Sequence, residues 1–388
     1  MALVVACGTT DSTGEEDDEK GPDLSDQDLT VPRAAGPLEF TEPCRAGKRL
    51  TIAAVGDVLL HSPLQKQAYE RGFESLWTGV TRIVGQADLT YANFEGPAAA
   101  GVNSSGQAVR DPGLVFDNAV YTSYPMFNYN PGLIPALQTL GVDVVSTANN
   151  HAMDRRSLGA DKTIEAMKEH GLPFTGTRPS TEPDAPRYAI TEKNGFKIGW
   201  IACSFSTNGI PDPKKQVLMC FTDTAEIERT IADLKTRTDA VIVTPHWGVE
   251  YVYTPGKDQK DLAKRFINAG ALAVFGGHPH VVQPWEKVTA ADGREGFVIY
   301  SLGNFVSGQT PTPRRASLVL YLGLTKDGAG KVTINGARYV PLTMRSWTVE
   351  PSDKAENSSE TRNLVETMFG KWNAMGSNDA LTTTPSCR

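Results

Sequence analysis

The sequence predicts a protein of the α/β class, with strands and helices alternating through residues 50–305. Two observations support this class. Short apolar runs recur along the chain, and each ends at glycine or at polar residues. Segments with apolar residues at helical spacing separate these runs. Because strands that alternate with helices form largely parallel sheets, we expect one α/β domain over this range.

The apolar pattern gives the order of the elements. We expect strands at 49–58, 88–95, 141–147, 187–191, 196–203, 240–244, 272–275, 297–301, 317–324 and 331–339. We expect helices at 63–86, 131–140, 157–169, 223–236, 258–268 and near 360–373. The pair Asn194-Gly195 predicts a hairpin turn, and Asp223 with Glu226 has the spacing of a capping box. Residues 96–131 predict a long loop, and residues past about 350 look weakly ordered apart from the last helix.

The charge of the chain is unevenly distributed. The net charge is −7, but nine of the 45 acidic residues lie in residues 1–30 beside a single lysine. The rest of the chain holds 36 acidic and 37 basic residues and is nearly neutral. We therefore expect no nucleic-acid partner. No apolar run reaches the roughly 18 residues that span a bilayer.

The first residues contain a cysteine in an unusual setting. Residues 1–8 resemble the end of a bacterial lipoprotein signal, in which a cysteine after an aliphatic box is lipidated. The basic region is missing and the apolar part is short, which favours a truncated or misassigned start, and an incidental Cys7 is the alternative. We expect contact with a membrane only through a lipid anchor at Cys7. The segment that follows is acidic and predicts a solvated tether.

The chain is thus expected to have three parts. These are a signal-like segment and disordered acidic tether at 1–45, a folded domain at 46–345, and a C-terminal extension at 346–388. Without Cys7, four of the five cysteines remain. We favour the disulfides Cys44–Cys387 and Cys203–Cys220 among three possible pairings, because domain termini often lie close together. Four reduced thiols in a cytosolic protein are the alternative.

Chemically versatile side chains gather where the apolar runs end. Five of the six histidines are in such positions, and only His170 looks like an ordinary surface residue. Ligands of α/β sheets bind beyond the carboxyl ends of strands. The residues expected there are Asp57, His61, Asn93, Glu95, Asn149, Asn150, His151, His246, His278 and His280. Mixed nitrogen and oxygen donors without cysteine suit a divalent ion such as Mn, Fe, Zn or Mg.

Each of these residues also has a structural interpretation. Asp57 could cap a turn, Glu95 could form a salt bridge, Asn149 or Asn150 could occupy left-handed positions, and His246 could be a core histidine. Taken singly, the structural interpretation is favoured for each. Taken together, nearly all the histidines at strand ends favour a metal or anion site.

Six motifs in this order resemble the bacterial capsule-synthesis CapA proteins, the poly-γ-glutamate capsule family. They cover about residues 50–310 and are Gly56-Asp57-Val-Leu-Leu60, Asn93-Phe-Glu95-Gly96, Asn149-Asn-His-Ala-Met-Asp154, His246-Trp-Gly-Val-Glu-Tyr251, Gly277-His-Pro-His280 and Tyr300-Ser-Leu-Gly-Asn-Phe305. The family is in turn similar to calcineurin-like metallophosphoesterases. The resemblance implies a four-layer α/β/β/α sandwich that holds two metals at strand ends.

The resemblance also implies a role for each residue. Asp57 and His280 would bind a first metal, and Glu95 would bridge two metals. Asn150, His246 and His278 would bind the second metal. His151 would be the general acid, oriented by Asp154. Supporting or substrate contacts are implied more weakly for His61, Asn93, Asn149, Arg155 and Asn304.

Two departures from the phosphoesterase pattern concern the first metal. Those enzymes usually begin with Asp-x-His, but here Leu59 follows Asp57 by two positions and His61 by four. Their second motif supplies Asp, whereas this chain has Glu95. One or two divalent ions are therefore expected.

The implied function is a metal-dependent hydrolase of phosphoester or γ-glutamyl bonds in capsule or poly-γ-glutamate metabolism at the bacterial cell envelope. A non-catalytic polymer-binding or assembly factor of capsule synthesis and export is the alternative, and an exported polyglutamate-degrading enzyme is a third. The expected partners are an anionic polymer or phosphoester and other capsule-synthesis proteins. Three basic pairs could contact carboxylates, Arg155-Arg156, Lys214-Lys215 and Arg314-Arg315. Only Arg155-Arg156 is favoured in that role, and the other two pairs are expected to be solvated surface.

Overall fold

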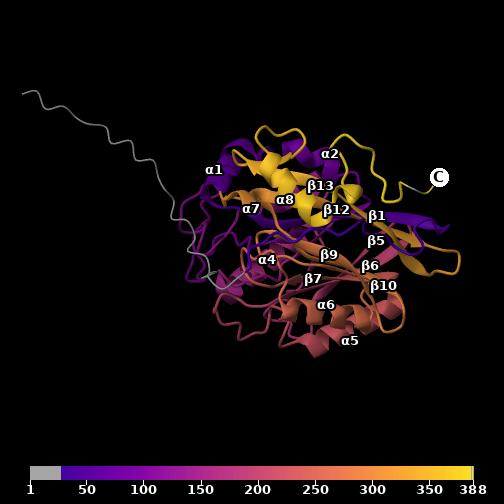
Figure 1. Ribbon diagram of the computed structural model, residues 1–388. Coiled ribbons are helices and arrows are strands. Elements are labelled where there is room, and N and C mark those ends of the chain that lie inside the picture. The colour runs from indigo at the N-terminus through magenta and orange to yellow at the C-terminus, as the bar shows by residue number, and fades with distance from the viewer. Residues whose placement is uncertain (1–27, 386, 388) are drawn as a thin grey trace, which may run out of the picture.

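The computed structural model describes residues 28–385 and 387, so the predicted lipid anchor at Cys7 and most of the acidic tether lie outside the described residues. Two β-sheets are stacked face to face, and helices cover their outer faces (Figure 1). This arrangement confirms the predicted four-layer α/β/β/α sandwich. Among the described residues, no helix is both long and apolar enough to cross a membrane.

The first sheet has eight strands, ordered β14-β13-β12-β1-β2-β3-β4, with β11 paired to β1. Strands β1 to β4 are parallel, and β12 to β14 are antiparallel to their neighbours. The bounds are β1 Lys48–Leu59, β2 Leu89–Phe94, β3 Val144–Ser146, β4 Phe174–Thr175, β11 Asn304–Ser307, β12 Ala316–Lys326, β13 Val332–Arg345 and β14 Thr348–Pro351. The strands expected at 317–324 and 331–339 are therefore confirmed as β12 and β13, which pair as an antiparallel hairpin.

The second sheet has six strands, ordered β5-β6-β7-β8-β10-β9. The four central strands are parallel, and β5 and β9 are antiparallel edges. The bounds are β5 Tyr188–Lys193, β6 Phe196–Ser204, β7 Ala240–His246, β8 Ala273–Phe275, β9 Val282–Thr289 and β10 Glu295–Leu302. The Asn194-Gly195 hairpin is confirmed, whereas β9 has no counterpart among the predicted strands.

Three apolar layers hold the sandwich together. The central layer joins the inner faces of the two sheets, with Ile52 and Leu320 on one side and Trp200 and Ile299 on the other. Helices α1 to α4 pack on the outer face of the first sheet, and α5 and α6 on that of the second. The helices are α1 Ser62–Arg71, α2 Thr81–Val84, α3 Leu133–Leu140, α4 Arg156–His170, α5 Thr224–Arg237, α6 Lys257–Ala269, α7 Thr312–Arg315 and α8 Ser359–Phe369.

Two local predictions need correction. The helix expected over 63–86 is broken after Arg71, because Gly72 has a φ of 86°, which a helix cannot continue through. Short 3₁₀ turns then lead to α2. The predicted capping box before α5 is also wrong. The Asp223 carboxylate accepts a hydrogen bond from the amide of Met219 instead, and Glu226 pairs with Arg187 at 2.5 Å.

The segment past residue 350 is more ordered than predicted. Strand β14 extends the first sheet, and α8 packs against β9, β12 and β13. Beyond α8, the Thr383 hydroxyl donates to Asn335, and Thr384 accepts from Arg49. Both predicted disulfides are present, Cys44–Cys387 and Cys203–Cys220. The first connects the strand-free segment before β1 to the C-terminal end.

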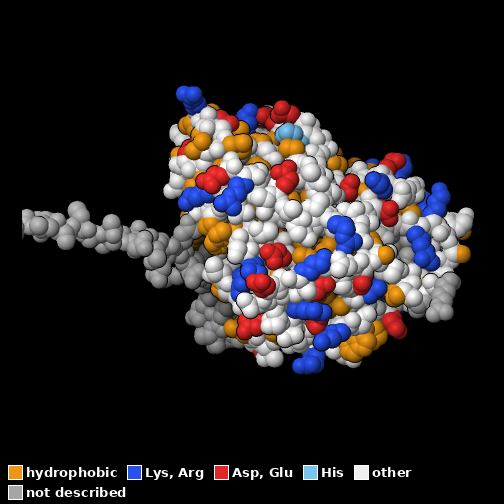
Figure 2. Space-filling view, turned by 90° about the horizontal axis from the view of Figure 1, so that it is seen from above, with side chains coloured by type: hydrophobic (Ala, Val, Ile, Leu, Met, Phe, Trp, Pro, Cys, Tyr) orange, Lys and Arg blue, Asp and Glu red, His pale blue; other side chains and the backbone are white. Residues whose placement is uncertain are grey.

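The surface seen from above has a mixed charge. In Figure 2, basic and acidic side chains are interspersed across this face, and apolar side chains form small patches between them. This pattern agrees with the near-neutral charge of the chain after residue 30.

Candidate metal centre

The predicted site residues meet at one edge of the sandwich. Asp57 lies near the end of β1, Glu95 follows β2, His246 ends β7, and His278 and His280 follow β8. Both sheets contribute, because the carboxyl ends of their parallel strands open to the same side. All five side chains are at most 3% exposed.

Asp57 is connected to several residues of the cluster. The amide of Asn93 donates to its Oδ1 at 2.8 Å, and the backbone N–H of His278 donates to its Oδ2 at 3.3 Å. The Nδ1 atom of His280 lies 3.3 Å from the same Oδ2. Burial raises the pKa of Asp57, but the hydrogen bond from His280 and the charge of His246 outweigh it, and the net shift is downward. Asp57 is therefore ionised and available as a ligand.

Glu95 is the most unusual group in the cluster. Its side chain is fully buried, yet neither carboxylate oxygen has a hydrogen-bond partner. Oε1 lies 3.4 Å from Nε2 of His246 and 3.8 Å from Nε2 of His280. A buried carboxylate without hydrogen bonds is costly, and metal coordination is one of the few ways to satisfy it. The position of Glu95 between two imidazoles agrees with the bridging role implied by the resemblance.

The loop that carries His278 and His280 is shaped by tight backbone contacts. Both residues have positive φ values, 96° and 55°. A Cβ on Gly277 would lie 2.8 Å from Oδ1 of Asp57, and one on Gly276 would lie 2.0 Å from the carbonyl oxygen of Tyr300. The two glycines therefore let this loop approach β1 and β10 closely. This approach brings both imidazoles next to the carboxylates.

The imidazoles of this loop are in different electrostatic surroundings. Burial lowers the pKa of His280, but Glu95 and Asp57 reverse this effect and raise it to about 10. Burial and the neighbouring His246 lower the pKa of His278 well below its usual value. The buried Nδ1 of His278 has no hydrogen-bond partner in the described structure. His278 is thus neutral, which is the form that binds metals.

Asn150 and Asn304 lie at opposite sides of the cluster. Oδ1 of Asn150 is 2.9 Å from Nε2 of His246, and Oδ1 of Asn304 is 2.9 Å from Nδ1 of His280. Asn149 points toward β2, where its Nδ2 donates to the carbonyl of Phe94 at 2.7 Å. Asn150 is therefore placed among the donor atoms, and Asn304 orients an imidazole.

His151 and Asp154 form a buried pair beside the cluster. Nδ1 of His151 lies 2.7 Å from Oδ2 of Asp154, which also accepts the N–H of Phe127 at 2.7 Å. Burial lowers the pKa of His151, but the charge and hydrogen bond of Asp154 outweigh it, and the net pKa is raised. Because Nδ1 is engaged by Asp154, Nε2 is the ring nitrogen that remains for contact with a substrate.

Glu250 is a site residue that the sequence reasoning missed. It forms a three-donor group with His278 and His280, in which one ligand atom of each lies within 4.8 Å of the others. Asp57, Glu95 and His246 form a second such group. Glu250 falls inside the motif His246-Trp-Gly-Val-Glu-Tyr251, so its presence there was the available signal.

His61 and Leu59 lie outside both groups. Leu59 is 1% exposed and packs in the outer apolar layer. The backbone N–H of Gly308 donates to Nδ1 of His61 at 3.1 Å, and the ring packs edge-on against Phe127. The first strand end therefore supplies one candidate metal ligand, Asp57.

The expectation that Arg155 contacts an anionic polymer is corrected by its burial. Its side chain is fully buried and donates to the carbonyls of Val102 and Val120 and to the hydroxyl of Thr122. These hydrogen bonds hold the loop over 96–131 in place, and the guanidinium also donates to the backbone carbonyl of Asp154. Arg314 is the cation near the cluster, with its guanidinium carbon 3.4 Å from the ring centre of Tyr251, which in turn contacts His280.

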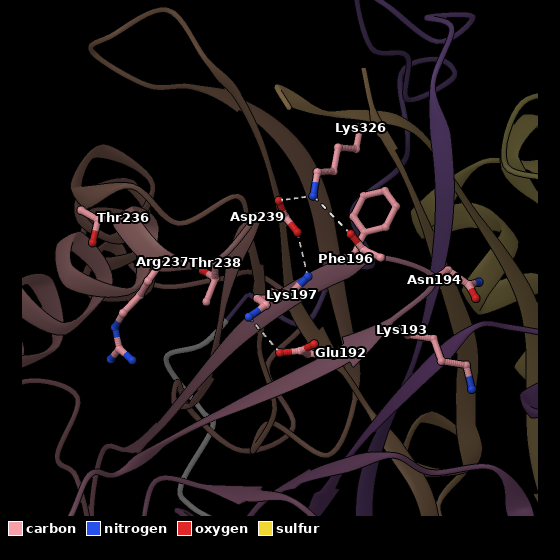
Figure 3. A pocket seen from close by; sticks show the side chains of 11 residues that line it. Glu192, Lys193, Asn194, Phe196, Lys197, Thr236, Arg237, Thr238, Asp239 and Lys326 are labelled. Carbon is pink, nitrogen blue, oxygen red and sulfur yellow. Dashed lines mark hydrogen bonds and ion pairs between the residues drawn. The ribbon is translucent and has the colours of Figure 1, made fainter. Parts of the chain in front are cut away.

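A separate hollow of about 580 Å³ lies at the other end of the second sheet (Figure 3). It is lined by the β5–β6 turn and the residues before β7, at the opposite end of β7 from His246. Two of its cations are paired, Lys197 with Glu192 and Lys326 with Asp239. The hollow is therefore distinct from the candidate metal centre.

The chain matches the family described as "Bacterial capsule synthesis protein PGA_cap" over residues 51–309. Since the match covers more than half of the sequence, the chain belongs to this family, and the resemblance to CapA proteins is confirmed. It is 27% identical over 313 residues to the PGA biosynthesis protein CapA of Bacillus subtilis (strain 168), covering 80% of this chain and 76% of that protein. It is 26% identical to the capsule biosynthesis protein CapA of Bacillus anthracis, covering 80% and 71%.

Solved structures with a similar fold include two nucleotidases. The NAD nucleotidase of Haemophilus influenzae aligns with a TM-score of 0.48 and 14% identity, over 87% of this chain and 66% of that one. The 5′-nucleotidase of Candida albicans SC5314 aligns with a TM-score of 0.38 and 11% identity, over 87% and 59%. This chain thus spans slightly less than two thirds of either nucleotidase. At these identities the likeness concerns the fold and not the activity.

Proposed function

We propose that the protein is a metal-dependent hydrolase of capsule or poly-γ-glutamate metabolism, acting on a phosphoester or a γ-glutamyl bond. The observation that supports this proposal most is the buried carboxylate of Glu95, which has no hydrogen bond and lies between His246 and His280. A purely structural protein has no reason to keep such a group, because its burial costs free energy without a compensating hydrogen bond.

The donors present fit one or two divalent ions. Asp57, Glu95 and His280 would hold one ion, and Glu95 with Asn150, His246 and His278 would hold another. Carboxylate, amide and imidazole donors without thiolate suit Mn, Fe, Zn or Mg. Bound ions of this kind would supply Lewis-acid chemistry, which polarises the electrophile and makes a nearby water more acidic.

His151 has the geometry of a general acid. Asp154 accepts a hydrogen bond from Nδ1, which fixes the ring and leaves Nε2 to donate a proton to the leaving group. The raised pKa of His151 keeps the ring protonated to higher pH than usual. The amide of Phe127 holds Asp154 from the other side. The pair is therefore pre-oriented for proton donation.

The substrate is expected to be anionic. Arg314 stacks on Tyr251 beside His280 and forms no ion pair among the described residues. An arginine in this position suits a carboxylate or phosphate that flanks the bond to be cleaved. A polyglutamate chain and a phosphoester both provide such a group.

An envelope location is proposed from the cysteines. Disulfides persist in oxidising compartments and are rare in the cytosol. The described part of the chain has two disulfides and no thiol left over. Lipid anchoring at Cys7 and contacts with other capsule-synthesis proteins belong to the same proposal.

The test is a measurement of bound metal followed by an activity assay. We expect purified protein to retain manganese or a related ion in elemental analysis, and to hydrolyse bis(p-nitrophenyl) phosphate or shorten poly-γ-glutamate when Mn²⁺ is added. H278A should lose this activity. H170A is the matched control, because His170 lies at the far end of α4. Wild-type protein with neither metal nor activity would contradict the proposal and favour a polymer-binding or assembly role.

A further inference from the structure

Glu250 is an acidic residue beside the two imidazoles of the β8 loop. It lies in the loop after β7, four residues beyond His246, and is partly buried. One of its carboxylate oxygens is within 4.8 Å of a ring nitrogen of both His278 and His280. Within the described residues, the carboxylate has no hydrogen bond or ion pair. It is a charged donor that faces two imidazoles without a partner of its own.

The backbone holds Glu250 in this place. The next residue, Tyr251, has a φ of 66°, and its N–H donates to the carbonyl of Pro279 at 2.7 Å. Pro279 lies between the two histidines of the β8 loop. The Nε2 atom of Gln309 also lies 3.4 Å from the hydroxyl of Tyr251. The loop of Glu250 is therefore tied directly to the loop of His278 and His280, independently of the glutamate side chain.

The cluster is short of one donor on the side of His280. Asp57 and Glu95 approach this imidazole, at 3.3 Å and 3.8 Å. The position two residues after Asp57 is Leu59, which is packed in the apolar layer and cannot coordinate an ion. His61 is turned toward the backbone of Gly308. Glu250 is the remaining charged donor in the described structure within reach of His280.

We propose that Glu250 is a ligand of the ion held beside His280, and that it takes the place of the imidazole missing from the first strand end. The proposal rests on the proposed function, because it assumes that the cluster binds metal. Asp57, Glu95, Glu250 and His280 would then offer three carboxylates and one imidazole to this ion. Such an oxygen-rich set suits a hard ion such as Mn²⁺ or Mg²⁺.

The first experiment measures metal binding rather than activity. The full-length protein is stripped with EDTA, titrated with Mn²⁺ by isothermal titration calorimetry, and analysed for bound metal after dialysis. Whether the wild type holds one ion or two, E250A should bind one of them at least ~10-fold more weakly. V249A is the matched control, because Val249 is the neighbouring residue and is 46% exposed.

The outcomes separate this proposal from the proposed function. An E250A protein that binds as many ions as the wild type, with unchanged affinity, overturns the role of Glu250 and leaves the metal centre intact. A wild type that binds no Mn²⁺ overturns both. An effect in V249A equal to that in E250A assigns the loss to the loop and also overturns the proposal.

Melting temperatures distinguish an effect of the substitution on folding from an effect on metal binding. In EDTA we expect E250A and the wild type to melt at nearly the same temperature, because the Glu250 side chain makes no hydrogen bond or ion pair with the described residues. Mn²⁺ should raise the melting temperature of the wild type more than that of E250A, since at a fixed concentration a tighter-binding ligand stabilises the folded state more. An equal rise in both proteins contradicts the assignment.

Discussion

Nδ1 of His151 lies 2.7 Å from Oδ2 of Asp154, and both side chains are buried beside the metal-binding cluster. This contact fixes the imidazole and directs its other nitrogen toward the site. It predicts that the importance of His151 depends on how much the leaving group needs a proton.

We expect H151A to lower kcat for an alkyl phosphodiester by roughly 10²–10⁴-fold, the usual range for a general acid. The loss should be much smaller for bis(p-nitrophenyl) phosphate, because p-nitrophenolate departs without protonation. D154N should act in the same direction. Metal content should be unchanged in both variants, and an equal loss on the two substrates would contradict the role of His151.

The close approach of Gly277 to Asp57 predicts that both stability and metal binding depend on this glycine. A Cβ at this position would lie 2.8 Å from Oδ1 of Asp57, which Asn93 holds in place. G277A should displace Asp57 or the β8 loop, weaken metal binding, and lower the free energy of unfolding by about 1–3 kcal/mol. G328A is the control, because a Cβ on Gly328 meets no atom within 4 Å. Elemental analysis that finds wild-type metal content in G277A would count against the site geometry.

Arg314 predicts a change in substrate affinity. Its guanidinium stacks on Tyr251 and is available to an anionic group of the substrate. We expect R314A to raise KM for poly-γ-glutamate or a charged phosphoester by roughly 10–100-fold, since a charge-assisted hydrogen bond contributes about 1.5–3 kcal/mol. Steady-state kinetics should show a nearly unchanged kcat. R229A, on the exposed face of α5, is the control, and a fall in kcat with an unchanged KM would rule out substrate binding by Arg314.

The two disulfides predict unequal losses of stability. Cys203–Cys220 closes a sequence separation of 17 residues and Cys44–Cys387 one of 343. In the chain-entropy account, removing the short loop costs about 3 kcal/mol and removing the long one costs more. Guanidinium unfolding of C203S/C220S and C44S/C387S measures both. A greater loss in C203S/C220S would show that local packing, and not chain entropy, dominates.

The Cys203–Cys220 variant also probes the site. Phe205, two residues after Cys203, packs on the ring of His278 with centroids 4.3 Å apart. Loosening this segment should weaken metal binding as well as stability, whereas C44S/C387S should leave metal binding unchanged. Calorimetric titration with Mn²⁺ distinguishes the two variants.

Most of the cluster was predictable because it follows a local rule. Asp57, His246 and His278 each stand where an apolar run stops, and the carboxyl ends of parallel strands meet at one edge of a sheet. The order of the motifs indicated the family, and the structure places the residues of these motifs close together. Glu250 was not found, because it stands in a loop without periodicity and reaches His278 only through the contact between Tyr251 and Pro279.

The predictions from sequence were wrong where contacts between distant residues or backbone angles determine the local structure. The helix over 63–86 has a plausible apolar pattern, but Gly72 adopts a conformation that ends it. Asp223 has the right spacing for a helix cap, but its carboxylate accepts a hydrogen bond from the backbone N–H of Met219 instead. Arg155 adjoins the His151 motif and was expected at the surface, yet the loop over 96–131 folds around it and buries it.

The sequence by itself determined the α/β class, the cysteine pairing that was favoured and the identity of most residues at the metal centre. These follow from local periodicity and from residue type, which the chain carries without reference to its fold. Only the tertiary structure decided that Glu95 is buried without a hydrogen bond, that Glu250 faces the imidazoles, and that Arg314 rather than Arg155 lies beside the site. These contacts join segments that are far apart in the chain. Their energies depend on how deeply the side chains are buried and how closely they approach one another, and a local sequence pattern does not contain this information.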